Sequence, residues 1–199
     1  VGGVFNGAVS NGVVPPAARF VTEWQSTSLP EVIRDINKYS NNVMARQLLL
    51  TLAADVLKLP ASPERGARVV KTWMANKGID TTQVVIENGS GLSRTERIPA
   101  GAMGRMLVSA FQSPTMPEFI SSLPLVGYDG TMRKRLTKQT VAGRAHIKTG
   151  TLNDVRAIAG YVLAASGKRY AVVCIINHPN AVGGQAAHDA LLQWIYENG

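Results

Sequence analysis

Cysteine, aromatic side chains and long apolar runs are scarce in this chain of 199 residues. The one cysteine, Cys174, excludes an internal disulfide, and its place in the run YAVVCIIN predicts a small, buried hydrophobic side chain. No apolar run approaches the roughly 20 residues that a membrane-spanning helix needs. The chain begins with Val1 rather than Met, so the lack of a recognisable signal peptide carries no information about targeting.

The basic residues are not arranged as in a nucleic-acid-binding protein. Net charge is +8, but aromatic residues make up only 6% of the chain. The densest basic cluster, Arg133, Lys134, Arg135 and Lys138, contains no aromatic residue, and the other basic residues are scattered. A nucleic-acid-binding protein normally concentrates its basic residues on one element. We therefore expect no nucleic-acid partner, whereas an anionic wall polymer or a membrane surface fits the charge equally well.

Four further polar positions have ordinary structural interpretations. His178 and His188 lack ligand spacing with any cluster of Cys, Asp or Glu, so no metal site is expected. His146 is expected at an exposed strand position, and Asp129 in the sequence YDGT is expected to form an Asx-type turn. The sequence thus predicts neither a metal nor a cofactor.

The order of the expected elements favours an α+β fold. The hydrophobic content of 45% suits a globular chain with one sizeable core. Residues 1–16 alternate Gly, Asn and small apolar residues, which predicts short strands and turns at the tail of a preceding region. Helices are expected over most of 17–59, 62–78, 99–113 and the C-terminal stretch, and strands over 83–88, 145–152, 156–165 and 169–177. Helices followed by about three consecutive strands and one helix indicate an antiparallel sheet rather than a doubly wound α/β fold.

Two polar tripeptides carry the candidate chemistry. Ser40-Asn41-Asn42 interrupts the helical stretch, and Lys148-Thr149-Gly150 lies on the strand expected over 145–152. They match two of the three motifs of penicillin-interacting serine enzymes, with Asn in place of Asp at the middle of the first. Each alone has another explanation, which is helix capping for the first and a surface lysine before a strand bend for the second.

Several further segments make the pattern more specific. LPEVIRDINKYSNNVMARQLLL, ENGSGLSRTERIPAG, LPLVGYDGTMRKRL and HIKTGTLNDVRAIAGYV follow one another along the chain. In these segments, in this order, the chain resembles the D-alanyl-D-alanine carboxypeptidase/endopeptidase family, the low-molecular-mass class C penicillin-binding proteins. The resemblance implies that residues 17–199 are the C-terminal portion of a penicillin-binding/serine β-lactamase-like domain, with a helical subdomain, an antiparallel sheet and a C-terminal helix. It also implies a periplasmic or other extracytoplasmic protein that acts on peptidoglycan stem peptides and is inhibited by β-lactam antibiotics.

The resemblance further implies how the strand at 145–152 contributes to a D,D-peptidase site. Lys148 would attract the terminal carboxylate of the substrate, to which the Thr149 and Thr151 hydroxyls would donate. The substrate would lie along this strand as an added strand, with the Thr151 backbone N–H as one oxyanion donor. Gly150 would allow the acyl group to approach the backbone closely.

The triplet would contribute the proton chemistry. By the same resemblance, Ser40 would relay a proton toward the leaving nitrogen, with Lys148 polarising its hydroxyl. Asn42 would hold the peptide carbonyl of the substrate and help to position the family's catalytic lysine. The glycine-rich loop at 89–94 lacks the Gly-x-Ser-x-Gly elbow, so a turn is expected there rather than a nucleophile. The resemblance implies that this loop is structural and lies near the floor of the site.

One motif of the family is absent from the chain. No serine is followed by Lys three positions later, so the nucleophile of the Ser-x-x-Lys motif is missing. We therefore expect an N-terminal part of the same enzyme, absent here or present as a second chain, to supply the nucleophile and two further strands. Without that part, the sheet would have an open edge and an uncovered apolar face.

Two alternative functions remain at this point. A serine β-lactamase relative would need a base for the hydrolytic water, and the sequence contains no convincing candidate. A non-catalytic peptidoglycan-binding module would keep the cleft without the nucleophile. An upstream Ser-x-x-Lys in the same gene product would distinguish the D,D-peptidase from this module.

Overall fold

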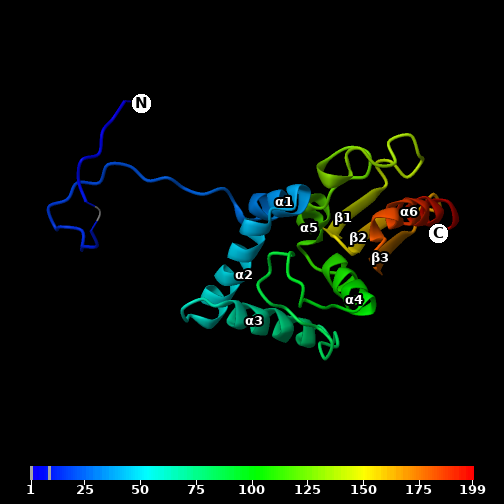
Figure 1. Ribbon diagram of the computed structural model, residues 1–199, viewed down its shortest axis with the longest axis horizontal. Coiled ribbons are helices and arrows are strands. Elements are labelled where there is room, and N and C mark those ends of the chain that lie inside the picture. The colour runs from blue at the N-terminus through cyan, green and yellow to red at the C-terminus, as the bar shows by residue number, and fades with distance from the viewer. Residues whose placement is uncertain (1, 9) are drawn as a thin grey trace.

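The computed structural model describes residues 2–8 and 10–199 and places a helical part beside a three-stranded sheet (Figure 1). The helices are α1 (Leu29–Tyr39), α2 (Asn42–Leu57), α3 (Pro63–Asn76), α4 (Ala100–Phe111), α5 (Met116–Ser122) and α6 (Gln185–Asn198). The strands are β1 (Ala145–Leu152), β2 (Val155–Leu163) and β3 (Arg169–Asn177). The α+β class predicted from the sequence is confirmed.

The sheet is antiparallel, and its strands lie side by side in chain order. Successive residues of a strand point to opposite faces. In β1, Ala145 and Ile147 are fully buried in a core that includes Leu192 of α6, whereas Lys148 points to the other face. Cys174 packs against the same core but is only half-buried, so the buried position expected from the sequence is not fully reached.

β3 ends the sheet on one side. Among the residues that the structure describes, no strand pairs with the outer edge of β3. On α6, Trp194 is 60% exposed. The structure therefore contains the open sheet edge that the sequence predicts. The same chain also leaves the large aromatic side chain of Trp194 exposed.

The helix ends follow local sequence signals. α1 begins with a capping box, in which the Glu31 carboxylate accepts from the Ser28 backbone N–H at 3.0 Å. α3 begins after Ser62, whose hydroxyl accepts from the Arg65 N–H at 3.3 Å, and the chain leaves it through Gly78 at φ +69°. Only glycine adopts that backbone conformation without strain. Throughout the described residues, the helices are too short or too polar to cross a bilayer.

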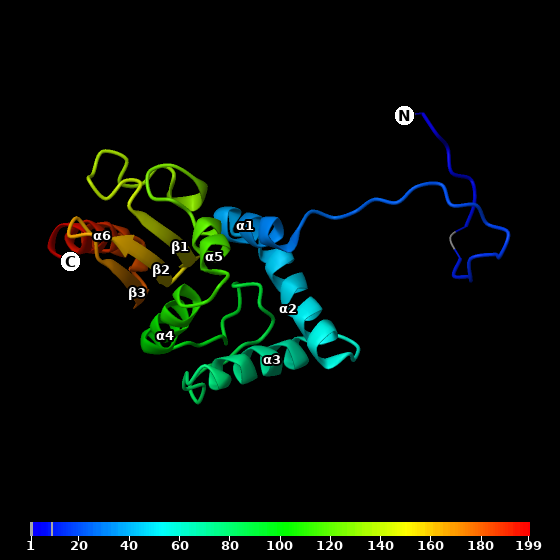
Figure 2. The ribbon, with the colours of Figure 1, turned by 180° about the vertical axis from the view of Figure 1, so that it is seen from behind.

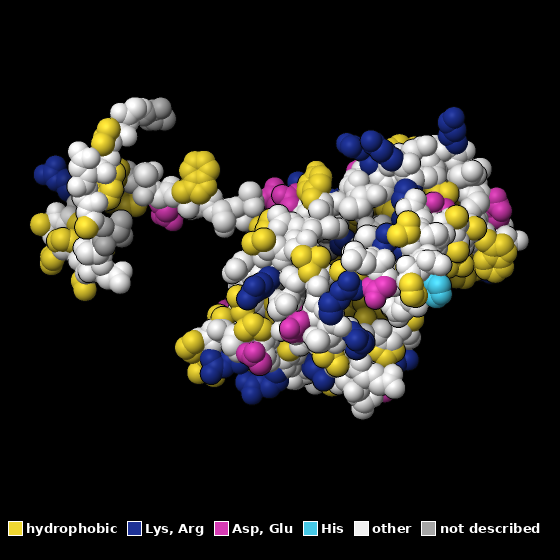
Figure 3. Space-filling view, viewed as in Figure 1, with side chains coloured by type: hydrophobic (Ala, Val, Ile, Leu, Met, Phe, Trp, Pro, Cys, Tyr) yellow, Lys and Arg dark blue, Asp and Glu magenta, His cyan; other side chains and the backbone are white. Residues whose placement is uncertain are grey.

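The N-terminal expectation is wrong in its secondary structure. In residues 2–8 and 10–16 the structure shows no strand, and helix begins at Leu29 rather than near residue 17. The described residues before α1 extend away from the body (Figures 1 and 2) and carry exposed apolar side chains (Figure 3). Phe20 and Trp24, just before α1, are 80% and 95% exposed. A strand needs a partner for its backbone N–H and C=O groups, and no other segment lies beside this one. The strand expected over 83–88 is reduced to one bridge between Val85 and Arg97, because the N–H groups of residues 87–89 donate to the Glu96 side chain rather than to a second strand.

A buried tyrosine joins the sheet to α4. Tyr161 of β2 is 2% exposed, its hydroxyl donates to the Leu107 carbonyl at 2.6 Å, and burial raises its pKa to about 12.

Replacing Tyr161 by Phe should lower the free energy of unfolding by about 1 kcal/mol, because one buried hydrogen bond is lost without a large cavity. Urea unfolding measures this, with Tyr39→Phe at an exposed position as the control. Equal stability of the two variants would contradict the prediction.

Candidate functional site

The Ser-Asn-Asn triplet forms the junction between α1 and α2. Ser40 ends α1 in the left-handed conformation, with φ +53° and ψ +49°. Asn41 caps α2, because its side-chain oxygen accepts from the Met44 N–H at 3.1 Å. Only one of the three residues is therefore used as an N-cap. Ser40 and Asn42 line a cleft, and the cap residue Asn41 also borders it.

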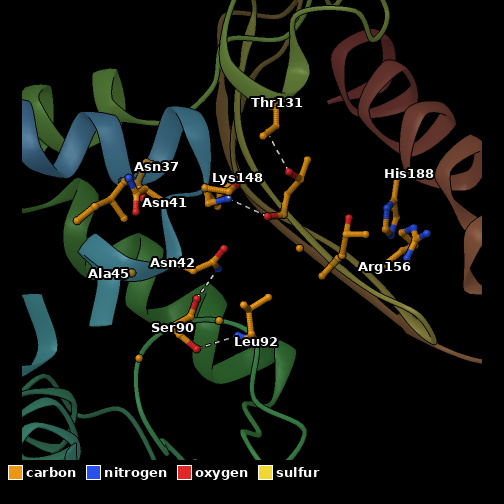
Figure 4. A pocket seen from close by; sticks show the side chains of 18 of the residues that line it. Asn37, Asn41, Asn42, Ala45, Ser90, Leu92, Thr131, Lys148, Arg156 and His188 are labelled. Atoms are coloured by element: carbon orange, nitrogen blue, oxygen red, sulfur yellow. Dashed lines mark hydrogen bonds between the residues drawn. The ribbon is translucent and has the colours of Figure 1, made fainter. Parts of the chain in front are cut away.

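Lys148 of β1 reaches across this cleft to the junction. Its Nζ donates to the Ser40 hydroxyl at 2.5 Å and to the Thr149 carbonyl at 2.9 Å. Figure 4 shows Lys148 among the residues that line the cleft. Burial lowers the pKa of Lys148, because a half-buried ammonium loses hydration. No carboxylate lies within ion-pair distance of Lys148 among the described residues. The cleft thus presents a cation that is free to attract an anionic ligand.

Asn42 is held by the glycine-rich loop on the opposite wall. Its side-chain Nδ2 donates to the Ser90 carbonyl at 2.5 Å (Figure 4). The loop is itself fixed by Glu96, one of whose oxygens accepts from three consecutive backbone N–H groups, those of residues 87–89, at 3.2 Å each. The loop therefore places a backbone carbonyl where it orients the Asn42 amide, which fits the structural role expected for it.

All six candidate residues from the sequence line one cleft of about 610 Å³. They are Ser40, Asn42, Lys148, Thr149, Gly150 and Thr151. Among the described residues, no Asp or Glu lines this cleft, whereas Lys148, Arg135 and Arg156 do. The cleft consequently favours a ligand that carries negative charge.

The cleft also contains residues that the sequence did not single out. Thr131 accepts a hydrogen bond from the Thr149 hydroxyl at 2.9 Å. Arg156 is the direct partner of Thr151 in the β1–β2 register, and its guanidinium bonds to the carbonyls of the connecting turn. His188 of α6 is 2% exposed, and its Nε2 has no partner among the described residues. The short connection between the strands expected over 145–152 and 156–165 could have identified Arg156 through this register, but no sequence signal connects His188 to the site.

Two other expectations need correction. His146 is not at an exposed position: it is half-buried, and its pKa is lowered mainly by burial and further by the charge of Lys38. Asp129 does not form an Asx turn. Its Oδ1 accepts from the N–H of Leu125, four residues earlier, at 2.7 Å, and its Oδ2 pairs with Lys38 at 2.7 Å. Tertiary partners, rather than local turn chemistry, decide both positions.

The arrangement of the sheet, helices and cleft matches known structures. The crystal structure of penicillin binding protein 4 (dacB) from Haemophilus influenzae, complexed with a β-lactam, aligns with a TM-score of 0.75 at 25% identity. The alignment covers 85% of this chain and 42% of that one. The fold is that of the penicillin-binding, β-lactamase-like α+β domains. The model of the D-Ala-D-Ala carboxypeptidase 3 (S13) family matches residues 1–197, and the chain belongs to this family.

Curated relatives agree with this assignment. The D-alanyl-D-alanine carboxypeptidase DacB of Haemophilus influenzae is 29% identical over 175 residues, which are 87% of this chain and 36% of the relative. Carboxypeptidase DacB of Mycolicibacterium smegmatis is 33% identical over 178 residues, which are 86% of this chain and 38% of the relative. The chain therefore spans less than two-fifths of the length of either relative.

Proposed function

We propose that this chain forms the substrate-binding and proton-relay part of a serine D,D-peptidase. The contact between Lys148 and Ser40, in a cleft that all six motif residues share, is the observation that carries the proposal. The substrate would be a peptidoglycan stem peptide that ends in D-Ala-D-Ala or is cross-linked through D-Ala. Such a substrate is extracytoplasmic, so we place the enzyme in the periplasm or outside the membrane.

The reaction would proceed through an acyl-enzyme. A serine oxygen bonds to the carbonyl carbon of the penultimate D-Ala, the C–N bond to the leaving residue breaks, and the serine proton passes to the leaving nitrogen. Water then hydrolyses the ester and regenerates the serine. A β-lactam would acylate the same serine through its ring amide and block the site.

The cleft offers groups for each requirement of this reaction. Lys148 and the hydroxyls of Thr149 and Thr151 would bind the terminal carboxylate. Thr149 would then turn its O–H from Thr131 to the ligand and accept from the Thr131 hydroxyl instead. Gly150 leaves room beside the strand, since the only atom within 4 Å of an added Cβ would be the Cβ of Ala157 at 3.4 Å. The backbone N–H of Thr151 would stabilise the oxyanion.

The junction of α1 and α2 would handle the proton and the substrate amide. Ser40 already shares a hydrogen bond with Lys148, so its hydroxyl is oriented and polarised for transfer to the leaving nitrogen. Asn42 keeps its side-chain oxygen available while its Nδ2 bonds to Ser90. Its amide would bind the substrate peptide and help to position the activating lysine.

The nucleophile would come from outside these 199 residues, because none of their serines has Lys three positions later. We propose that it belongs to a Ser-x-x-Lys segment in an N-terminal part of the same enzyme. That part would also cover the open edge of β3.

Acylation of the full-length gene product tests the proposal. The protein is incubated with benzylpenicillin, its intact mass is measured under denaturing conditions, and the acylated peptide is sequenced by mass spectrometry. We expect one adduct on the serine of a Ser-x-x-Lys segment outside residues 1–199, and release of D-Ala from an acyl-D-Ala-D-Ala peptide. An adduct on a serine within the 199 residues would overturn the assigned roles. Neither adduct nor D-Ala release would favour the non-catalytic module, and rapid penicillin turnover would favour a β-lactamase.

A further inference from the structure

Residues 129–131 lie between the two elements that bring Ser40 and Lys148 together. They begin the short 3-10 turn at Gly130–Met132, which contacts both α1 and β1. Thr131 borders the cleft, beside Thr149 and Lys148 (Figure 4). Asp129, Gly130 and Thr131 make contacts of different kinds, some with α1 and others on the β1 side.

On the α1 side, Asp129 binds the penultimate residue of the helix that ends at Ser40. The Lys38 Nζ donates to Asp129 Oδ2 at 2.7 Å and to the Leu123 carbonyl at 2.7 Å. The Lys38 side chain is 11% exposed, so removal of its carboxylate partner would leave a nearly buried charge uncompensated. This ion pair fixes α1 two residues before the Ser40 hydroxyl.

Gly130 allows the turn to approach α1 at backbone distance. A Cβ at this position would lie 2.7 Å from the Lys38 carbonyl oxygen, and the residue has φ +54°. Both conditions exclude a larger side chain without displacement of one of the two segments. The turn and the last turn of α1 are thus in direct contact as well as linked by charge.

On the β1 side, two connections lead to Lys148. The hydroxyl of Thr149 donates to that of Thr131 at 2.9 Å. Asp129 Oδ1 accepts from the Leu125 N–H at 2.7 Å, in a segment whose neighbour Pro124 accepts from the Ile147 N–H at 2.8 Å. Asp129 therefore has one oxygen bonded toward α1 and the other bonded toward the segment that pairs with β1.

We propose that Asp129 is a positioning residue, which acts with Lys38 and Thr131 to hold Ser40 and Lys148 at hydrogen-bond distance. This inference rests on the proposed function, because the proposed function is what makes the Ser40–Lys148 contact necessary for acylation. An error of about 1 Å in such a contact can slow a reaction about a hundredfold while leaving substrate binding intact. A merely structural ion pair would change stability without changing acylation.

The test uses the full-length protein and a fluorescent penicillin. The dependence of the acylation rate on penicillin concentration separates the limiting rate constant from the dissociation constant of the non-covalent complex. Asp129→Asn keeps an oxygen for the Leu125 N–H but removes the charge that pairs with Lys38. We expect a tenfold or greater fall in the limiting rate constant, with a dissociation constant within threefold of the original. Lys38→Met should give a similar loss, Lys38→Arg should retain most of the rate, and the Lys38→Met/Asp129→Asn double variant should lose no more than either single change.

Two further variants separate positioning from general stability. Thr131→Val removes only the hydroxyl that accepts from Thr149, at an exposed position, and should lower the limiting rate constant about threefold to tenfold. Asp55→Asn breaks an exposed ion pair with Lys58 far from the cleft and should leave the rate unchanged. If Asp129→Asn does not fold, Thr131→Val decides: a rate equal to that of the unaltered protein overturns the inference.

The outcomes distinguish this inference from the function on which it rests. An unaltered protein that forms no acyl adduct would overturn both. If the unaltered protein is acylated and Asp129→Asn shows only a lower melting temperature, with the same rate constant well below that temperature, the positioning role is wrong and the proposed function stands. Loss of the rate constant in Asp129→Asn, with recovery in Lys38→Arg relative to Lys38→Met, supports the positioning role.

Discussion

Replacing Lys148 by Met should lower the rate of penicillin acylation by about a thousandfold or more. The change keeps the unbranched side chain but removes the ammonium that contacts Ser40 and lies free to bind the ligand carboxylate. Loss of one positioned proton-transfer group costs about 10²–10⁴ in rate, and carboxylate binding is lost in addition. The second-order rate constant with a fluorescent penicillin, measured on the full-length protein, gives the effect directly.

Lys134→Met is the matched control for this change. Lys134 lies in the densest basic cluster of the sequence and is exposed, so its loss alters the net charge equally without touching the cleft. We expect it to retain at least half of the rate. If both variants lose the same factor, long-range attraction of the anionic ligand explains the effect, and the specific role of Lys148 is wrong.

The same lysine should determine the basic side of the pH profile. Burial lowers the pKa of Lys148 from its usual value of 10.5, so the reactive ammonium is lost at a lower pH than in an exposed lysine. Acylation should therefore decline with rising pH before 10.5. In Lys148→Arg the decline should move to higher pH, because a guanidinium keeps its proton. A basic limb at the same pH in both proteins would assign it to another group.

That depressed pKa also has a consequence for stability. Above pH 10.5, Lys148 is neutral in the folded and the unfolded chain, and its burial has no charge penalty. As pH falls below 10.5, the unfolded chain takes up a proton on Lys148 more readily than the folded chain does. The free energy of unfolding therefore decreases until pH has fallen through the folded pKa, where the folded chain also holds the buried ammonium. If Lys148 binds the ligand as proposed, its charge at neutral pH is thus obtained at some cost in stability.

Several elements of the fold were predictable because their signals are local. Alternating apolar residues and the Ser166-Gly167-Lys168 turn predict the β2–β3 hairpin, and the structure has strands at 155–163 and 169–177. Pro63 begins α3 and Gly78 follows its end, and a window of three or four residues is enough to predict both positions. The pairing of Ser40 with Lys148, 108 positions apart, was predictable only because both belong to motifs of one family.

The remainder depends on contacts that local patterns do not encode. Asp129 has the neighbours of a turn residue, yet its carboxylate binds Lys38, 91 positions away in the chain. His188 lies on an amphipathic helix that predicts burial, but only the folded structure places it beside the cleft. The N-terminal segment has the composition of short strands, and strands form only where another strand is available. These differences all arise from long-range partners that a sequence window does not contain.

Gly160→Ala should destabilise the protein by more than about 4 kcal/mol, the exceptional range for a single substitution. An added Cβ would lie 2.0 Å from the backbone oxygen of His146 on the neighbouring strand. Backbone atoms of a paired strand cannot yield as a flexible side chain can, so β1 and β2 would have to separate. Separation at His146 would also displace Lys148, two residues further along the same strand. Thermal or urea unfolding should therefore show the loss, together with loss of acylation.

Gly150→Ala is the control that separates folding from chemistry on the same strand pair. Its added methyl group would meet only the Cβ of Ala157, at the ordinary contact distance of 3.4 Å, so stability should change by less than about 1 kcal/mol. The methyl group would instead occupy the surface along which we propose that the acyl group lies, and acylation should fall about tenfold to a hundredfold. If Gly160→Ala were as stable as Gly150→Ala, the β1–β2 register that pairs Gly160 with Ile147 would be wrong. If Gly150→Ala were acylated at the unaltered rate, the ligand would not run along β1, and the roles proposed for Thr149 and Thr151 would fail with it.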